Sequence, residues 1–307
     1  MLKPHALAPG DRLAILAPAS TFRREDFDDG IEEVRRLGFV PVYDESVFAR
    51  QGYLAGSAEH RASAIRQAWR DPSIAGIVAV RGGYGSAQTL PLLDADEGRA
   101  AGKPFVGYSD LTSVLTFLTM NCGMVAFHGP MLDGRLGGGA RRYDRESFTK
   151  ALCDRAPMGE LRPEGLEALK SGEAVGPLFG GTVTQLLASL GTPFAFDPPP
   201  GHVLLFEEVG ERPYRLDRMV TQLRQTGLLA RAAAIVIGEL PGCDEPGGEP
   251  TARAVMADVL ADFRGPVVFG FPTGHAIAPA VTLPLGVACR VIAGPRPRIV
   301  IEESAVA

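Results

Sequence analysis

The sequence predicts an α/β protein of two domains, in which a doubly wound, mostly parallel N-terminal sheet precedes a smaller C-terminal α/β domain. In the first half, short apolar runs alternate with amphipathic stretches of helical spacing. The runs do not alternate between apolar and polar residues, which is typical of parallel strands covered by helices on both faces. A similar succession resumes after a polar segment with scattered glycine and proline.

The N-terminal domain is expected to comprise residues 1–150. Its helices are predicted from amphipathic spacing at 24–37, 58–71 and 111–118. Its strands are predicted from apolar runs of strand length, which occur at 12–18, 40–43, 74–80, 104–106 and 124–127.

A linker is expected at 151–175, because this stretch is polar and follows the glycine-rich run Gly134–Gly139. The C-terminal domain then comprises residues 176–307. Its predicted helices are 182–190, 214–229 and 251–263. Its predicted strands are 203–206, 233–237, 267–269 and 282–285.

Composition and charge restrict the partners that we expect. Lys and Arg are scattered and the formal charge is −5, so a small molecule is expected as the partner and nucleic acid is not. Four cysteines lie far apart without CxxC spacing, so neither a metal nor a cofactor is expected. No apolar window reaches the roughly 20 residues that cross a bilayer, and no secretory signal is recognisable. We therefore expect a cytoplasmic protein with no membrane partner.

Ser109 is the candidate nucleophile, in the segment Gly107–Asp110 between a predicted strand and a predicted helix. A sharp turn of this kind projects a side chain from the sheet edge and directs the next backbone N–H groups at an oxyanion beside it. The geometry indicates covalent acyl transfer, although the spacing differs from the usual GxSxG motif. The alternative interpretation is that Ser109 or Asp110 caps the helix.

A glycine-rich turn, Arg81–Gly85, follows the predicted strand 74–80. Backbone N–H groups at such a turn can hold an anion, and glycine lets a ligand approach closely. The alternative is a tight turn that needs positive φ. The turn also begins like the dinucleotide motif GxGxxG, with Asp110 as a ribose partner, but Gln88 occupies the position of the third glycine.

Candidates for the acid and the base follow strands of the second half. Glu207 and Glu208 end a predicted strand, and His275 lies in a loop that Pro and Gly restrain. Glu211 competes for the role of the acid and His128 for that of the base. Taken singly, the glutamates could be a solvated pair and His275 an ordinary loop histidine.

The chain order of Ser109, Glu207 and His275 is nucleophile, acid and base, as in other α/β serine hydrolases. Each of the three follows a predicted strand. The three signals therefore support one another as parts of one site.

Several segments carry a family resemblance over nearly the whole chain: Leu7–Asp11, Ala17–Ser20, Arg81–Gly85, Gly107–Asp110, Gly180–Gly181, Leu190–Pro193, Phe206–Glu208, Tyr214–Arg218, Gly274–His275 and Leu283–Gly286. Through them the sequence resembles the serine LD-carboxypeptidase family, the muramoyltetrapeptide carboxypeptidases, together with the related microcin C immunity peptidases.

The resemblance implies a Ser-Glu-His triad at Ser109, Glu207 and His275, with Glu207 preferred over Glu208. It also implies a flavodoxin-like or amidotransferase-like N-terminal domain, a site between the domains and a homodimer. The implied activity is hydrolysis of the amide between an L-configured centre and a terminal D-amino acid, as in the muropeptide tetrapeptides of cell-wall recycling.

When Ser109 attacks the amide carbonyl, a negatively charged oxygen forms. The backbone N–H groups of Gly83 and Asp110 are predicted to stabilise this oxyanion. The predicted substrate-binding residues, which would receive the terminal carboxylate, belong to the same turn and are Arg81, Gly82, Tyr84 and Gly85.

Two features bear on the substrate. Thr182 follows the paired glycines where the family often has Asn, and the only tryptophan, Trp69, lies in the first half. Because the microcin branch resembles a binder that stacks an aromatic ring on a nucleobase, we favour a cell-wall peptide over an aminoacyl-nucleotide or microcin C-like acyl amide. A third interpretation is a non-catalytic nucleotide- or sugar-binding module.

Overall fold

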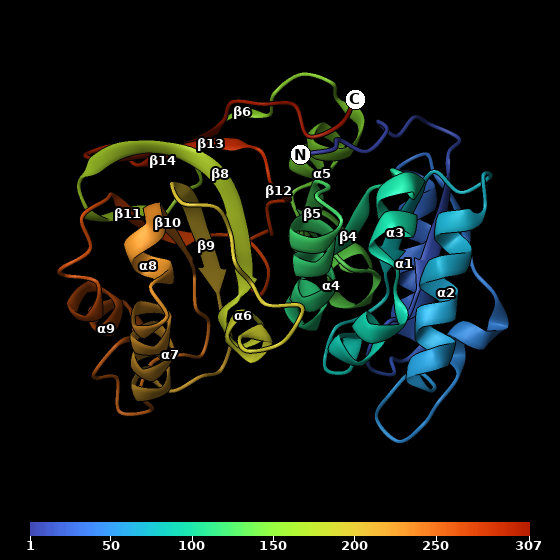
Figure 1. Cartoon of the computed structure of the whole chain (residues 1–307), viewed down its shortest axis with the longest axis horizontal. Coiled ribbons are helices and arrows are strands. Elements are labelled where there is room, and N and C mark those ends of the chain that lie inside the picture. The colour runs from blue at the N-terminus through green and yellow to red at the C-terminus, as the bar shows by residue number, and fades with distance from the viewer.

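The computed structural model describes residues 1–307 and contains two sheets that lie side by side (Figure 1). The N-terminal sheet has the strand order β12-β5-β4-β3-β1-β2. Its strands are β1 (Arg12–Leu16), β2 (Val40–Val42), β3 (Gly76–Ala79), β4 (Phe105–Gly107), β5 (Ala126–His128) and β12 (Leu283–Leu285). All neighbours are parallel except β12, which is antiparallel to β5.

The C-terminal sheet has the order β6-β14-β13-β8-β9-β10-β11-β7. Its strands are β6 (Gly159–Leu161), β7 (Glu167–Lys170), β8 (Gly172–Thr182), β9 (His202–Glu207), β10 (Ala232–Gly238), β11 (Val267–Phe271), β13 (Ala288–Ala293) and β14 (Arg298–Ile301). Only β8 to β11 are mutually parallel, so their carboxyl ends lie at one edge of the sheet.

The α-helices are α1 (Arg24–Arg36), α2 (Ala58–Arg70), α3 (Ala95–Ala101), α4 (Thr112–Thr116), α5 (Arg145–Cys153), α6 (Val183–Ser189), α7 (Pro213–Gln225), α8 (Leu228–Arg231) and α9 (Ala252–Val259). The shorter helical turns are η1 (Glu45–Phe48), η2 (Ser86–Leu92), η3 (Ser109–Leu111), η4 (Phe117–Asn121), η5 (Leu132–Leu136) and η6 (Gly139–Arg141). None of the helices has the length and apolar character needed to span a bilayer.

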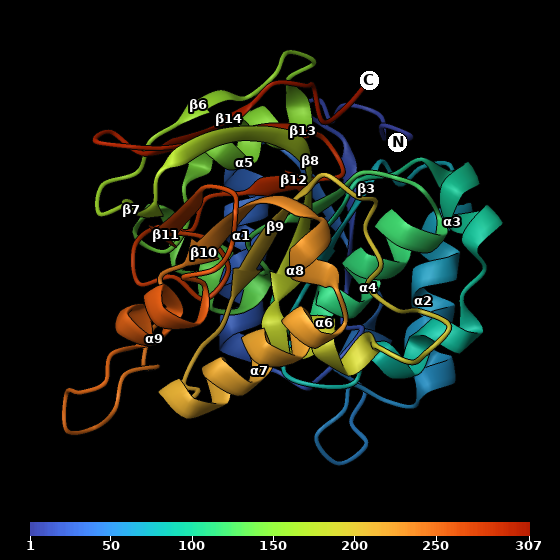
Figure 2. The same cartoon turned by 60° about the vertical axis from the view of Figure 1, so that its left-hand side comes forward.

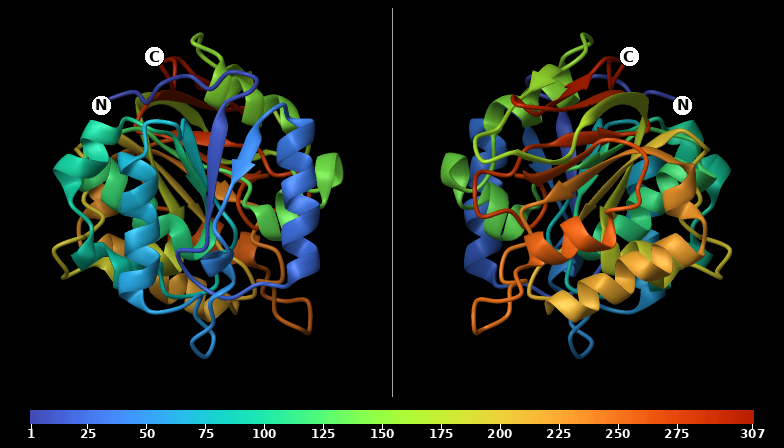
Figure 3. Two further views of the ribbon diagram at one scale, coloured as in Figure 1. Left: turned by 90° about the vertical axis from the view of Figure 1, so that its right-hand side faces the viewer. Right: turned by 90° about the vertical axis from the view of Figure 1, so that its left-hand side faces the viewer.

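Helices cover both faces of the N-terminal sheet. Buried residues of α1, such as Phe27 and Ile31, pack from one side, and Ile65 and Trp69 of α2 pack from the other (Figure 3). In the C-terminal domain, α7 and α8 lie over β9 and β10 (Figure 2). The two-domain α/β class with a mostly parallel, doubly wound N-terminal sheet is therefore confirmed.

The structure differs from the expected domain bounds in two places. The segment 151–175 is more than a connection, because it contains β6, β7 and the first residues of β8. The strand expected at 282–285 forms, but it pairs with β5 of the N-terminal sheet. Leu283 and Leu285 are buried there, so this strand covers the edge that β5 would otherwise expose.

The helix expected at 214–229 is also interrupted. Gly227 has φ 79°, a left-handed conformation that ends α7 and separates it from α8.

Candidate active site

The two domains contact each other where β4 and β8 end. The backbone N–H of Thr182 donates to Thr112 Oγ1 at 3.1 Å, and the Ser113 hydroxyl donates to Gln185 Oε1 at 3.2 Å. Gly181 has φ 150°, and an added Cβ there would lie 2.6 Å from Thr112 Oγ1. Glycine therefore allows the backbone of β8 to approach the helix that follows Ser109.

Ser109 occupies a strained turn directly after β4. Its φ of 62° is left-handed, whereas the preceding Tyr108 is extended. Non-glycine residues in this region cost of the order of 1–3 kcal/mol and cluster at functional sites. Gly82 lies against the serine, since an added Cβ would be 3.0 Å from Ser109 Cβ and 3.2 Å from Asp110 N. The turn thus projects the half-buried hydroxyl beside the glycine-rich segment.

Asp110 does not cap the helix that directly follows Ser109. Neither η3 nor α4 has a side-chain cap. The Asp110 carboxylate instead accepts the N–H of Ser86 at 2.8 Å, and the Ser86 hydroxyl donates to the Asp110 carbonyl at 2.6 Å. Burial raises the pKa of Asp110, and the hydrogen bonds from Ser86 oppose the rise. The side chain therefore ties the nucleophile turn to the glycine-rich turn.

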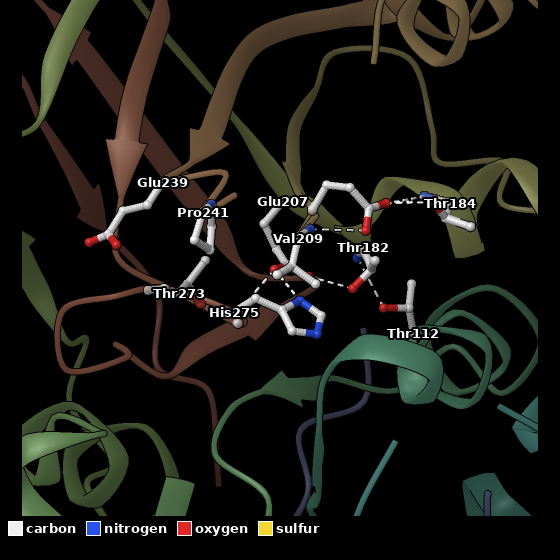
Figure 4. A network of polar contacts seen from close by, with 12 residues as sticks. Thr112, Thr182, Thr184, Glu207, Val209, Glu239, Pro241, Thr273 and His275 are labelled. Carbon is white, nitrogen blue, oxygen red and sulfur yellow. Dashed lines mark hydrogen bonds and ion pairs between the residues drawn. The ribbon is translucent and has the colours of Figure 1, made fainter. Parts of the chain in front are cut away.

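Glu207 and His275 form the most direct polar contact of the site (Figure 4). Glu207 Oε2 lies 2.8 Å from His275 Nδ1 and also accepts the backbone N–H of His275 at 2.9 Å. The carboxylate is buried, whereas the imidazole is 19% exposed. Burial alone would raise the pKa of Glu207, but the hydrogen bonds and nearby imidazoles lower it to about 2. The ionised carboxylate fixes the imidazole with Nδ1 toward Glu207.

Thr182 contacts the other oxygen of the same carboxylate. It pairs with Glu207 across the parallel strands β8 and β9, and its hydroxyl donates to Glu207 Oε1. Thr182 therefore donates a hydrogen bond to the acid. The sequence alone did not reveal this contact.

Glu208 and Glu211 have other partners. Glu208 Oε2 accepts the N–H of Thr184 at 3.0 Å and its hydroxyl at 2.6 Å, so it holds the first turn of α6. Glu211 forms an ion pair with Arg215 at 3.2 Å. Of the three glutamates, only Glu207 contacts His275. Strand alternation explains this, because adjacent residues at the end of β9 point to opposite faces.

The loop that carries His275 is held by Arg135, which sequence reasoning missed. Arg135 is buried, and its Nη2 donates to the carbonyls of Gly274 at 2.6 Å and Ala276 at 2.7 Å. The two acceptors flank His275 on both sides. Arg135 belongs to the glycine-rich run 134–139, and its carbonyl acceptor at Gly274 lies 139 residues later in the chain. No motif in the sequence indicated a contact between the two segments.

His128, the rival base, lies at the end of β5 and is fully buried. Neither ring nitrogen has a hydrogen-bond partner, and burial lowers its pKa to about 4. An added Cβ at Gly274 would lie 2.8 Å from His128 Nε2 and 2.6 Å from Glu207 Oε2. The neutral imidazole therefore packs behind the acid, away from solvent.

The remaining predicted residues lie around the glycine-rich turn. Gly83 has φ 87°, and the N–H of the next residue, Tyr84, donates to Ser20 Oγ at 3.0 Å. Tyr84 is 49% exposed, and Arg81 forms an ion pair with Asp133 at 3.4 Å. The turn thus presents exposed backbone and a partly exposed cation.

The structure joins the acid to the base but holds no hydrogen bond between Ser109 and His275. Tyr108, the neighbour of Ser109, contacts the imidazole edge-on with ring centroids 5.1 Å apart. Contacts between nucleophile and base are often long in enzymes without substrate.

Comparison with known sequences identifies the family. The sequence profile of the LD-carboxypeptidase N-terminal domain matches residues 13–129, and that of the LD-carboxypeptidase C-terminal domain matches residues 175–291. The chain belongs to the LD-carboxypeptidase family. It is therefore a hydrolase of the carboxypeptidase type.

Individual relatives agree with this assignment. The chain is 35% identical to a putative carboxypeptidase of Streptomyces coelicolor, over 94% of this chain and 92% of the relative. It is 32% identical to a probable murein peptide carboxypeptidase of Bacillus subtilis, over 92% and 89%. Among solved structures of LD-carboxypeptidase relatives, the microcin C7 self-immunity protein in complex with aspartyl sulfamoyl adenosine has a TM-score of 0.92 and 26% identity, with both chains covered completely.

Proposed function

We propose that this LD-carboxypeptidase is a serine enzyme that removes the terminal D-amino acid from murein tetrapeptides. The observation that carries the proposal is the double hydrogen bond from His275 to the buried, ionised Glu207. It holds the imidazole with Nδ1 engaged, which leaves Nε2 free to accept a proton. The strained Ser109 supplies a hydroxyl at a neighbouring turn.

In the proposed mechanism, His275 Nε2 removes the proton of the Ser109 hydroxyl while Oγ attacks the amide carbonyl carbon. The protonated imidazole then gives this proton to the departing amine of the D-amino acid, and an acyl-enzyme remains. Water, deprotonated by the same imidazole, hydrolyses the ester and restores Ser109. Glu207 stabilises the imidazolium in both halves of the cycle.

The proposed oxyanion donors are the backbone N–H groups of Gly83 and Asp110. Their proximity is supported by Gly82, the neighbour of Gly83, because a Cβ added at Gly82 would lie only 3.2 Å from Asp110 N. Loss of one such donor typically costs about 2.7–4 kcal/mol of transition-state stabilisation.

The terminal carboxylate of the substrate is proposed to bind at the glycine-rich turn. Arg81 is 47% exposed despite its ion pair with Asp133, so its remaining N–H groups are open to an anion. Gly82, Tyr84 and Gly85 are proposed to shape this position. The Tyr84 N–H already donates to Ser20 Oγ and the Gly85 carbonyl accepts from Arg61, so Arg81 supplies the charged contact. This assignment explains why the enzyme would act only at a free chain end.

The decisive experiment is mass spectrometry of a murein tetrapeptide that has been incubated with the wild-type protein and with Ser109→Ala. The wild type should release one D-alanine, and the variant should be slower by about 10⁴-fold or more. A fluorophosphonate probe should label the wild type at Ser109. Near-normal turnover by Ser109→Ala would refute the assignment of the nucleophile.

A second candidate substrate is an aminoacyl-nucleotide conjugate. It is favoured by an exposed aromatic pair beside the glycine-rich turn, in which the rings of Tyr53 and Tyr84 lie 5.9 Å apart. Aromatic rings of this kind can stack on a nucleobase. Parallel assays with the tetrapeptide and with an aminoacyl sulfamoyl nucleoside decide between the two substrates. In the same assays, Tyr84→Ala should weaken the binding of the nucleoside and leave the binding of the tetrapeptide unchanged.

We also propose that the protein is a homodimer, as the family resemblance implies, and that it is cytoplasmic, as the sequence indicates. Light scattering during size-exclusion chromatography measures the molar mass and so tests the dimer. Cell fractionation tests the location.

A further inference from the structure

A buried arginine lies behind the glycine-rich turn and is not part of the proposed triad. Arg61, in α2, is 1% exposed. Its guanidinium donates to the carbonyl of Gly85 at 2.5 Å, to that of Pro18 at 2.9 Å and to Gln88 Oε1 at 2.6 Å. None of these acceptors is a carboxylate. The carbonyls of Gly56 and Ser57 also accept from Arg61, each at 3.3 Å, so neutral oxygens rather than a contacting anion compensate the cost of burying this cation.

One peptide group connects Arg61 to the nucleophile turn. The carbonyl of Gly85 accepts from Arg61, and the N–H on the other side of the same peptide bond, from Ser86, donates to Asp110 Oδ2 at 2.8 Å. The Gly85–Ser86 peptide is therefore held between a buried cation and a buried carboxylate. Asp110 directly follows Ser109, and its own N–H is a proposed oxyanion donor.

The shape of the turn and the approach of the arginine depend on each other. Gly85 has φ 122°, and an added Cβ would lie 2.9 Å from Arg61 Nη1. Gln88, which does not fit the dinucleotide motif, contacts the guanidinium instead. A planar group with several fixed donors can hold all these acceptors together, which a lysine cannot do.

Arg61 also fixes the second loop beside the proposed oxyanion site. It holds the carbonyl of Pro18, and Ser20, two residues further on, accepts the N–H of Tyr84 at 3.0 Å. Arg61 thus holds the glycine-rich turn directly at Gly85, and it also holds the loop whose Ser20 accepts the N–H of Tyr84.

We infer that Arg61 is a positioning residue, which holds the Gly85–Ser86 peptide against Asp110 and thereby sets the spacing of the oxyanion donors Gly83 and Asp110. The inference rests on the proposed function. Arg61 bonds to the turn and the neighbouring loop and not to Ser109, so its effect on catalysis passes through the backbone. Displacement of an oxyanion donor weakens the binding of the transition state more than the binding of the substrate.

Arg61→Met tests this role. Removal of a whole donor costs about 10²–10³ in kcat, so a displaced pair should lower kcat by roughly 10- to 100-fold, with KM changed less than about threefold. Rates are expressed per fluorophosphonate-labelled molecule, which removes any misfolded fraction from the comparison. The control is Arg66→Met on the same helix, because Arg66 is 38% exposed and pairs only with Glu97, at 2.9 Å. This control should keep wild-type kcat.

A second readout separates positioning from general damage. A peptide boronic acid forms a tetrahedral adduct with the nucleophile and should lose affinity for Arg61→Met by the same factor as kcat. The tripeptide product, which lacks a tetrahedral centre, should bind as it does to the wild type. Wild-type kcat in Arg61→Met, or a lower kcat with unchanged boronic acid affinity, would overturn the inference.

Two milder variants cover the case in which Arg61→Met does not fold. Arg61→Lys keeps the charge but loses the planar guanidinium with its several fixed donors. Gln88→Leu removes one acceptor at an exposed position. Both should lower kcat several-fold at constant KM, and full kcat in both would overturn the inference. Failure of the proposed function gives a different pattern, because the wild type itself would then release no D-alanine and Ser109 would stay unlabelled.

Discussion

The Thr182 hydroxyl donates a hydrogen bond to Glu207 Oε1, the carboxylate oxygen that His275 leaves free. Because β8 and β9 are parallel neighbours, their register places the two residues side by side. The amide of an asparagine is also a donor, so the position requires a hydrogen-bond donor and not a hydroxyl in particular.

Thr182→Val should destabilise the protein and lower its activity, because valine has a similar shape but cannot donate to the buried carboxylate. A lost hydrogen bond to a buried charged group costs about 1–3 kcal/mol. Urea unfolding at neutral pH measures this loss, and D-alanine release measures the activity. Thr182→Ser, which keeps the hydroxyl, is the control. Equal stability of Thr182→Val and the wild type would show that Glu207 does not depend on this donor.

Gly274→Ala should separate the acid from the base. The new Cβ would lie 2.5 Å from Glu207 Cδ and 2.8 Å from His128 Nε2, so the loop that carries His275 must shift. Turnover should fall by at least about 100-fold, since a 1 Å misplacement at a catalytic group can cost this much.

Gly191→Ala is the matched control for this change. Gly191 also has positive φ, 78°, but no atom lies within 4 Å of an added Cβ. Its cost is therefore backbone strain alone, of the order of 1 kcal/mol, without loss of activity per folded molecule. If both alanine variants keep wild-type turnover, the contact at Gly274 does not position His275.

The sequence predicted much of the fold because the N-terminal strands and helices carry strong local patterns. The first helix, for example, was expected at 24–37 and occupies Arg24–Arg36. The strand β12 was found, but its partner was not predictable from local spacing, because it crosses back to β5 more than 150 residues earlier in the chain. Long-range pairing of this kind depends on which sheet edge remains open, and no short segment records it.

The site was predictable only where the residue type carries the chemistry. His275 and Glu207 stood out as titratable groups after strands, and the structure places them in contact. Arg135 and Arg61 did not stand out, because each acts on backbone carbonyls far away in the sequence. An arginine that binds carbonyls leaves no spacing pattern, so only the folded chain reveals it.

Two buried groups, His128 and Glu207, should each contribute to the loss of stability in acid. Burial lowers the pKa of His128 to about 4, so between pH 6.5 and 4 the unfolded chain binds a proton that the folded chain does not. Stability therefore falls as the pH drops through this window. The pKa of Glu207 is lowered to about 2 in the folded chain, against an ordinary value of 4.5. Stability is therefore lost further as the pH falls below 4.5, because the carboxylate of the unfolded chain is protonated first.

His128→Phe isolates the His128 contribution, because phenylalanine fills a similar volume but does not titrate. The His128 contribution amounts to about 3 kcal/mol at pH 4, given 1.36 kcal/mol for each pKa unit. Urea unfolding of wild type and variant at several pH values between 7 and 4 should show a shallower decline for His128→Phe. Part of the slope should persist, because burial also lowers the pKa of His202. Parallel curves for the two proteins would mean that His128 is already protonated in the folded state. The assignment of a neutral imidazole behind Glu207 would then be wrong.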